Sequence, residues 1–169
     1  FASIQRVFGD WQRKTLPPTE FVAPPDPARR VIVVNMPEAV QTEVRAGHIG
    51  IKRNHQDYMA LNMTLRILGG EGANRLHQVL RTERGLTYGV YSAFSPMQAR
   101  GPFMLNLQTR AEMSEGTLKL VQDVLADYLK TGPTQKELDD AKRELAGSFP
   151  LSTASNADIV GQLGAMYRG

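Results

Sequence analysis

The amino-acid sequence predicts an α+β domain in which a largely antiparallel sheet has helices packed on one face, in the order ββααββαα. Two observations support this prediction. Segments rich in β-branched or alternating apolar residues occur as two pairs, and turn-forming residues join the members of each pair. Segments with apolar residues at helical spacing follow each pair. Because strands joined by short turns run antiparallel, the sheet is expected to be largely antiparallel.

The N-terminal part of the chain is expected to lie outside this domain. Residues 1–11 can form a helix, and the stretch TLPPTEFVAPPDPARR that follows contains five prolines, which exclude a helix and favour an extended strap. We therefore predict that residues 1–29 are the end of a preceding element with a Pro-rich linker. Residues 30–169 are predicted to be the main domain, either complete or cut short at its C-terminus.

The first pair of strands is predicted at residues 31–36 and 41–51. The run VIVVNM is rich in β-branched residues, and the Pro-Glu pair after it supplies a turn. In the second run the alternation favours one shared face. The residues expected on that face are Val44, Ala46 and His48.

Two helices are predicted between the strand pairs. The first begins at Asn54, a capping residue type with an acid three residues later at Asp57. It ends at Gly69 and Gly70, because glycine tolerates the left-handed conformation of helix C-terminal caps. A second, shorter helix is predicted over residues 74–82. The apolar side of the first helix would comprise Tyr58, Leu61, Leu65 and Leu68.

The second strand pair is predicted at residues 86–93 and 103–108, with the turn-forming stretch SPMQARGP between them. An amphipathic helix over 115–130 follows. A capping box at 134–137 then opens the last helical stretch, which Pro150 must kink or end. The apolar face of the 115–130 helix would comprise Leu118, Val121, Leu125 and Tyr128.

Composition and charge argue against several kinds of function. The chain has no cysteine, so disulfides, thiolate nucleophiles and cysteine-bound metals are excluded. Its 20 basic and 17 acidic residues are interspersed, which does not favour a nucleic-acid-binding surface. No run approaches the roughly 18 consecutive apolar residues of a membrane span.

The three histidines do not form a zinc-peptidase pair, which needs two histidines within one helical turn and a glutamate beside them. They are His48, His55 and His77. We therefore predict no metal site in this chain. The glycine-rich run GGEGAN follows a predicted helix and lacks the lysine of a phosphate-binding loop, so a hinge between helices explains it.

A predicted helix-to-strand junction, LRTERGLTYGVYSAF, holds a cation and a phenol close in sequence. Arg81 lies seven residues before Tyr88, with Gly85 between them. Considered singly, Arg81 could be an exposed cation at a helix C-terminus, and Tyr88 an ordinary strand aromatic. The surrounding sequence favours a functional interpretation.

That surrounding sequence, from LRILGGEGANRL to GPFMLNLQT, resembles the second, non-zinc half of the pitrilysin/insulinase family of zinc peptidases. The resemblance covers roughly residues 30–166, and 68–90 is its most specific portion. The family usually has serine where Asn74 stands, and both residue types cap helices well. The matching pieces are Leu-Gly-Gly at 68–70, Arg-Leu at 75–76, Leu-Arg at 80–81 and Gly-Leu-x-Tyr at 85–88.

The resemblance implies a processing-peptidase-like metallohydrolase half that faces a homologous half carrying His-x-x-Glu-His and zinc. It implies that Arg81 and Tyr88 are catalytic residues that bind an extended peptide substrate, and that the phenol stabilises charge on the scissile carbonyl. Gly85 would permit the turn that brings them together. No cofactor is expected in this chain, since zinc would belong to the partner half, in the same polypeptide or in a separate subunit. Alone, the chain is expected to be inactive.

The resemblance leaves a second function open. Family members also serve as core subunits of respiratory complexes and as inactive partners in processing peptidases. The presence of both Arg81 and Tyr88 favours the substrate-binding lobe, because a scaffold need not keep the pair. The compartment stays open between the bacterial periplasm and the cytoplasm.

Overall fold

The computed structural model describes residues 1–12, 14–15, 17, 22, 25, 32, 34, 36–70, 74–95 and 99–168. The chain divides into two compact units, Phe1–Val33 and Val34–Gly169. The first unit contains α1 (Ala2–Phe8), the helix predicted near the N-terminus, and none of its residues is buried. In the described part of the chain, every helix is too short or too polar to cross a membrane.

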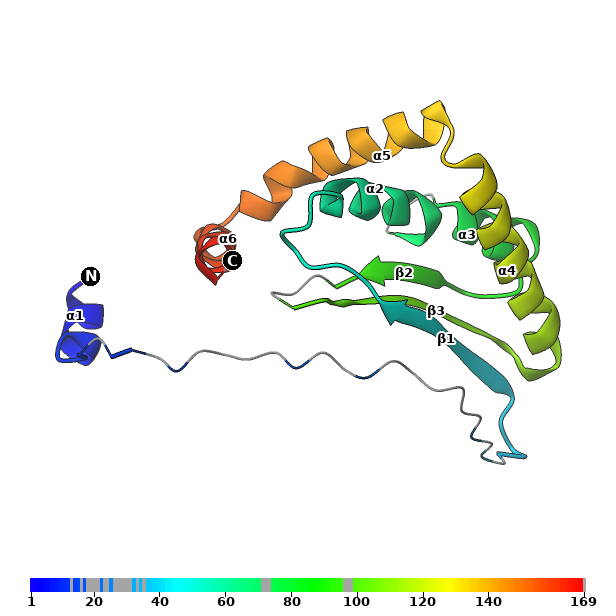
Figure 1. Ribbon diagram of the computed structural model, residues 1–169, viewed down its shortest axis with the longest axis horizontal. Helices are drawn as coiled ribbons and strands as arrows, with labels where there is room; N and C mark the ends of the chain where they lie inside the picture. Colours follow the sequence, from blue (N-terminus) through cyan, green and yellow to red (C-terminus); the bar gives the residue numbers. More distant parts are fainter. Residues whose placement is uncertain are drawn as a thin grey trace. The chain divides into compact units, whose positions relative to one another are not determined.

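The described residues of the second unit form a three-stranded sheet with β3 (Pro102–Arg110) in the centre, flanked by β1 (Gln41–Ile49) and β2 (Val90–Phe94) (Figure 1). Both pairings are antiparallel, and Leu107 of β3 lies opposite Val44 on one side and Val90 on the other. These strands confirm the antiparallel sheet predicted from the alternating runs.

Helices cover one face of this sheet. The helix α2 (Tyr58–Gly69) packs against β2, and α5 (Gln135–Ser148) packs on α2, so that the two helices form successive layers (Figure 1). The short α3 (Arg75–His77) continues as a π-helical turn, Gln78–Glu83, and α4 (Ser114–Thr131) contacts this run and β3. The predicted α+β class, with helices on one face of the sheet, is confirmed.

The core lies between the sheet and the helices α2, α3 and α4, and it includes the π-helical turn that follows α3. Leu76 and Leu80, one helical turn apart, are completely buried, as is Leu105 on the inner face of β3. All three belong to one apolar cluster that also includes Val121 and Tyr128 of α4. The helical run over residues 75–83, called the α3 run below, is therefore anchored by its apolar side. Its other side remains available for polar residues.

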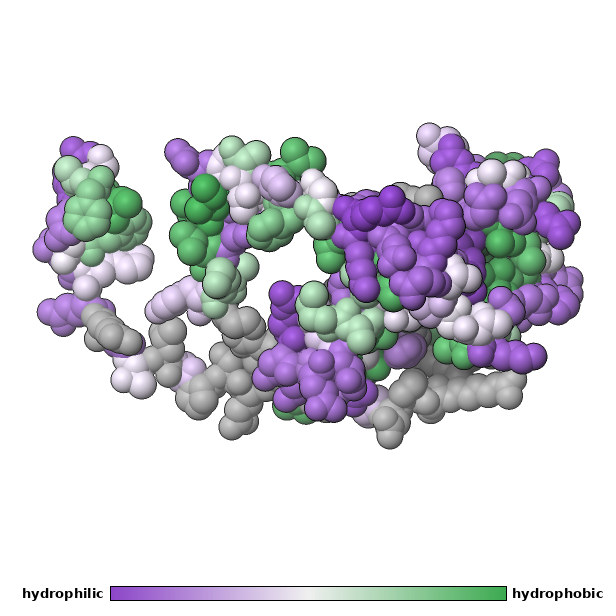
Figure 2. All heavy atoms as spheres, turned by 90° about the horizontal axis from the view of Figure 1, so that it is seen from above, coloured by the Kyte–Doolittle hydropathy of each residue, from purple (hydrophilic) through white to green (hydrophobic). Residues whose placement is uncertain are grey.

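The chain after α5 follows the expected break at proline. Pro150 lies in the 3₁₀ turn Phe149–Thr153, and a further helix, α6 (Asn156–Arg168), begins beyond it. The 3₁₀ turn Ala111–Met113 similarly leads from β3 into α4. Figure 2 shows apolar side chains gathered on α6, in contrast to the hydrophilic outer surface of α5.

Two expectations about α2 are wrong. The helix begins at Tyr58 with Asp57 as its N-cap, not at Asn54, because the preceding residues form turns in which the Tyr58 amide donates to the His55 carbonyl at 3.0 Å. It ends at the expected glycines, but neither has a left-handed backbone. Gly69 is instead required by close packing, since a Cβ there would lie 2.6 Å from the Ser92 hydroxyl oxygen.

Other expectations are corrected in detail. Leu118 is 41% exposed, and the buried side of α4 consists instead of Thr117, Val121, Val124 and Tyr128. The strand predicted from residue 86 begins at Val90, because Thr87 and Gly89 form a turn. The strand predicted over 31–36 lies largely outside the described residues. Its described members are Ile32, Val34 and Met36, which are exposed and outside any strand.

We predict that Gly69→Ala destabilises the second unit by about 1–3 kcal/mol, because the added methyl group overpacks the contact between α2 and β2. Urea unfolding measures the change. The matched control is Gly116→Ala in α4, where no described heavy atom lies within 4 Å of the new Cβ. That substitution is expected to stabilise the protein by about 0.5–1 kcal/mol. A Gly69→Ala protein as stable as wild type would show that α2 and β2 are not closely packed.

Candidate functional site

Arg81 and Tyr88 lie together at the protein surface. The guanidinium carbon of Arg81 is 4.6 Å from the centroid of the Tyr88 ring, a cation–π contact. Both side chains are exposed, Tyr88 to 87% of its surface. An exposed contact of this kind contributes only about 0.5–1 kcal/mol to folding stability. Its interest is that it brings the two side chains together.

The backbone between the two side chains closes a tight turn. The Gly85 amide donates to the Arg81 carbonyl at 3.0 Å, and the Leu86 amide donates to the Leu80 carbonyl at 2.9 Å. Gly85 has a φ of 61°, in the left-handed region that favours glycine. No described heavy atom lies within 4 Å of a Cβ built there. Glycine is thus required here by backbone conformation and not by lack of space.

Three threonines stabilise this turn through hydrogen bonds. The Thr109 hydroxyl of β3 donates to the Leu86 carbonyl at 2.8 Å. Since that bond uses its only proton, Thr109 must accept in its 3.2 Å contact with the buried Thr117 hydroxyl of α4. Thr87, also buried, both donates to the Gly89 carbonyl and accepts from the Gly89 amide. Sequence reasoning missed these three residues, because their partners come from separate elements or from a turn with no distinctive motif.

A histidine also contacts Arg81. The Nε2 atom of His77 lies 3.3 Å from Nη1 of Arg81, one helical turn further along the same run. The signal for this contact is the four-residue spacing of His77 and Arg81 within a predicted helix.

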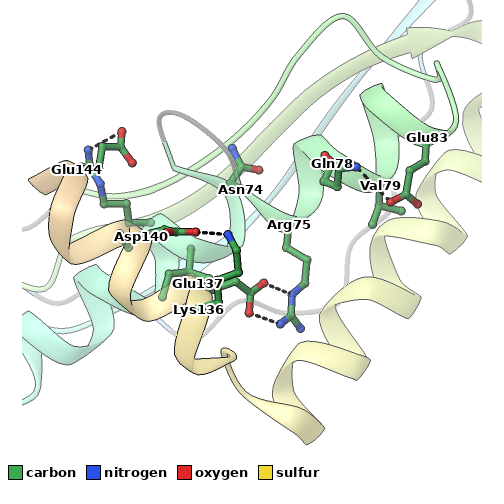
Figure 3. Close-up of a pocket in the computed structure, with 12 residues that line it drawn as sticks. Asn74, Arg75, Gln78, Val79, Glu83, Lys136, Glu137, Asp140 and Glu144 are labelled. Carbon is green, nitrogen blue, oxygen red and sulfur yellow. Dashed lines mark hydrogen bonds and ion pairs between the residues drawn. The ribbon is translucent and has the colours of Figure 1, made fainter.

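A separate cavity of about 420 Å³ lies between the α2–α3 region and α5 (Figure 3). Ion pairs cross or border it: Arg75 with Glu137, Lys136 with Asp140, and Arg66 with Glu144. The described residues that line this cavity do not include Arg81 or Tyr88. The cavity and the Arg81–Tyr88 pair are therefore distinct features.

The pair Arg75–Glu137 clamps the helices together. The guanidinium of Arg75 donates to both oxygens of Glu137, at 2.9 and 2.7 Å, as the two dashed lines in Figure 3 show. Glu137 also closes the capping box of α5 by accepting from the Thr134 amide, which confirms the box predicted at 134–137. The guanidinium of Arg75 further lies 4.7 Å from the Tyr128 ring centroid. One arginine thus connects the starts of α3 and α5 to α4.

The ionisable groups of this clamp do not titrate near neutral pH. The hydrogen bonds from Arg75 lower the pKa of Glu137 to about 2. Burial raises the pKa of Tyr128 to about 12, and its hydroxyl donates to the Thr64 carbonyl at 2.9 Å. Because a general acid or base works best with a pKa near the operating pH, these groups suit a structural role.

No cluster in the described part of the chain fits a metal ion. Groups of three or more histidine, aspartate and glutamate side chains with metal-binding geometry are absent there. His48 contacts the Ile49 carbonyl, His55 accepts from the Asp57 amide, and His77 contacts Arg81. The described residues of this chain do not fit a zinc site.

The sequence and fold are similar to those of known proteins. Residues 1–145 match the family described as the peptidase M16 inactive domain. The chain is 36% identical over 121 residues to the non-peptidase homolog YmxG of Helicobacter pylori, covering 69% of this chain and 26% of that protein. It is 31% identical over 118 residues to the uncharacterized zinc protease YmxG of Bacillus subtilis, covering 70% of this chain and 29% of that protein.

Solved structures agree with these sequence relations. A peptidase M16 inactive domain from Pseudomonas fluorescens has 69% sequence identity and a TM-score of 0.72, covering 77% of this chain and 31% of that one. A protease from Helicobacter pylori shares the fold at 22% identity with a TM-score of 0.69, covering 76% of this chain and 31% of that one. The chain thus spans less than a third of the length of these relatives.

We predict that Glu137→Gln destabilises the protein at neutral pH by about 2 kcal/mol, allowing for partial solvent screening of the pair. The folded pKa of Glu137, about 2, lies below its ordinary value of 4.5. Its stabilising effect is therefore complete above pH 4.5 and is lost as the pH falls toward 2. Chemical denaturation at several pH values should show the gap between wild type and variant closing over that range.

The matched control is Asp123→Asn. Asp123 forms an exposed ion pair with Lys119 at 3.1 Å, and its loss should change stability by less than about 0.5 kcal/mol. A gap between wild type and Glu137→Gln that stayed constant from pH 7 to pH 2 would contradict the assignment of the clamp to Glu137 ionisation.

Proposed function

The chain belongs to the family of peptidase M16 inactive domains, and on that premise we propose that it is the substrate-binding lobe of a zinc metallopeptidase. The match confirms the resemblance to the non-zinc half of the pitrilysin/insulinase family. In this proposal Arg81 and Tyr88 hold an extended peptide and polarise its scissile carbonyl. We further propose that residues 30–169 form this lobe and that residues 1–29 connect it to a preceding element.

The observation that supports this role is the exposed stack of Arg81 on Tyr88, above a turn whose backbone is held by hydrogen bonds. Peptide hydrolysis builds negative charge on the scissile carbonyl oxygen, and a preorganised phenol donor aimed there stabilises the transition state. A guanidinium offers forked donors that can hold neighbouring peptide carbonyls. Both groups are donors, both are exposed to solvent, and the guanidinium lies against the phenol ring.

The rest of the machinery would come from a homologous half, in the same polypeptide or in a separate subunit. That half would supply zinc and a general base, and with them the activated water. The relatives named as zinc proteases support this division of labour, because the described residues of this chain offer no zinc ligand set. Alone, the chain would bind peptide without cutting it.

A second candidate function is a non-catalytic scaffold within a processing-peptidase-like or respiratory complex. The relative named as a non-peptidase homolog favours this alternative. The two candidates separate on one measurement, the hydrolysis of an unstructured peptide by this chain together with its homologous partner half. Hydrolysis that requires both components supports the substrate-binding lobe. A stable complex without hydrolysis supports the scaffold.

We predict that Tyr88→Phe in the assembled peptidase lowers kcat by about 10²-fold, because removing one oxyanion donor typically costs 10²–10³ in turnover. KM should stay within about threefold, since the donor acts mainly in the transition state. Steady-state kinetics with a fluorogenic peptide measures both constants.

The matched control is Tyr91→Phe. Tyr91 is a half-exposed tyrosine of β2, three residues further along the chain. Removing its hydroxyl should leave kcat unchanged. If Tyr88→Phe also turned over at the wild-type rate, Tyr88 would have no catalytic role.

A further inference from the structure

We propose that His77 is a positioning residue, which accepts a hydrogen bond from the Arg81 guanidinium and holds it against the Tyr88 ring. The inference rests on the proposed function, because Arg81 has to be fixed only if it binds substrate. It adds His77 to the site as a third residue beside Arg81 and Tyr88.

The geometry places His77 where it can do this. Its Nε2 atom is 3.3 Å from Nη1 of Arg81, and the carbon at the centre of the same guanidinium is 4.6 Å from the Tyr88 ring centroid. His77 and Arg81 are four residues apart on a helical run, so their side chains lie on the same face. The guanidinium therefore has two contacts, one from its own helix and one from beyond the Gly85 turn.

The base of the His77 side chain is itself well fixed. Its backbone amide donates to Oδ1 of Asn74 at 2.8 Å, which caps the helical run. The neighbouring residues Leu76 and Leu80 are completely buried and anchor the same run in the core. An imidazole on this rigid base can restrict an otherwise exposed arginine side chain.

Hydrogen-bond chemistry determines the form of His77 in this contact. A guanidinium can only donate, so Nε2 must accept and the imidazole must be neutral with its proton on Nδ1. A protonated imidazole would have no acceptor and would repel Arg81. Within the described ranges, Arg81 is the ionisable group that bonds to His77, while nearby Glu83 contacts Gln78 at 3.4 Å. No described residue accepts a hydrogen bond from Nε or Nη2 of Arg81, so these donors can bind a peptide.

The contact is tested first by NMR on this chain, without any need for catalysis. Side-chain ¹⁵N shifts report which imidazole nitrogen of His77 carries the proton. We expect the Nδ1-protonated form to dominate in wild type and to decline in Arg81→Met. The control Arg84→Met, which removes an exposed cation three residues further along, should leave the His77 tautomer unchanged. The same tautomer in wild type and Arg81→Met would overturn the proposal.

The functional effect is tested in the assembled peptidase. His77→Leu should lower kcat/KM by about three- to tenfold, the worth of one hydrogen bond, with an unchanged melting temperature. His77→Gln should recover part of the loss, because its amide oxygen can accept. In an Arg81→Met background, His77→Leu should have no further effect, since the group it positions is gone.

An equal loss from His77→Leu with and without Arg81 would overturn the positioning role. A wild-type rate for Arg81→Met would instead contradict the proposed function of Arg81, and the NMR result would still decide whether His77 holds that side chain. The two failures are therefore distinguishable.

Discussion

Two backbone hydrogen bonds, from the amides of Gly85 and Leu86 to the carbonyls of Arg81 and Leu80, join a helix end to the approach of a strand. Because Gly85 adopts the left-handed conformation, the chain reverses within a few residues and brings a guanidinium onto a phenol ring. The turn is held from the apolar side by buried leucines and threonines, so its two polar side chains project from a rigid base. Binding groups on such a base need little reorganisation when a ligand arrives.

Two arginines of the α3 run differ in solvent exposure, and this difference suits one to a structural role and the other to ligand binding. The side chain of Arg75 is largely buried. It donates to Glu137 and stacks its guanidinium against the Tyr128 ring, and so joins α3, α5 and α4. Arg81 lies six residues later and is exposed, and among the described residues its side chain contacts His77 and Tyr88. A partly buried ion pair with both partners satisfied contributes to a unique packing arrangement. A solvent-facing guanidinium with free donors suits recognition of peptide carbonyls.

Sequence reasoning succeeded where the determinants are local. The capping box at 134–137, the Asn74 cap and the break at Pro150 each depend on a few adjacent residues, and all three occur in the structure. It failed where the partner is distant in sequence. Gly69 is small because Ser92 lies against it, which no local pattern reveals. Thr109 and Thr117 were missed for the same reason, since their contacts arise only after strand and helices pack. The contact of His77 with Arg81, by contrast, joins residues only four apart on one helical run. Motif and spacing brought Arg81 and Tyr88 forward, but only coordinates show them in contact.

The central claim is that Arg81 and Tyr88 contact one extended peptide whose cleavage is performed by a homologous zinc half. The most direct measurement is a crystal structure of the assembled peptidase with an inactivated zinc half and a bound peptide. The account predicts the Tyr88 Oη atom within about 2.7–3.1 Å of the scissile carbonyl oxygen, with Arg81 donating to a nearby peptide carbonyl. An ordered peptide lying more than about 6 Å from both side chains, beyond the reach of any direct hydrogen bond, would contradict it.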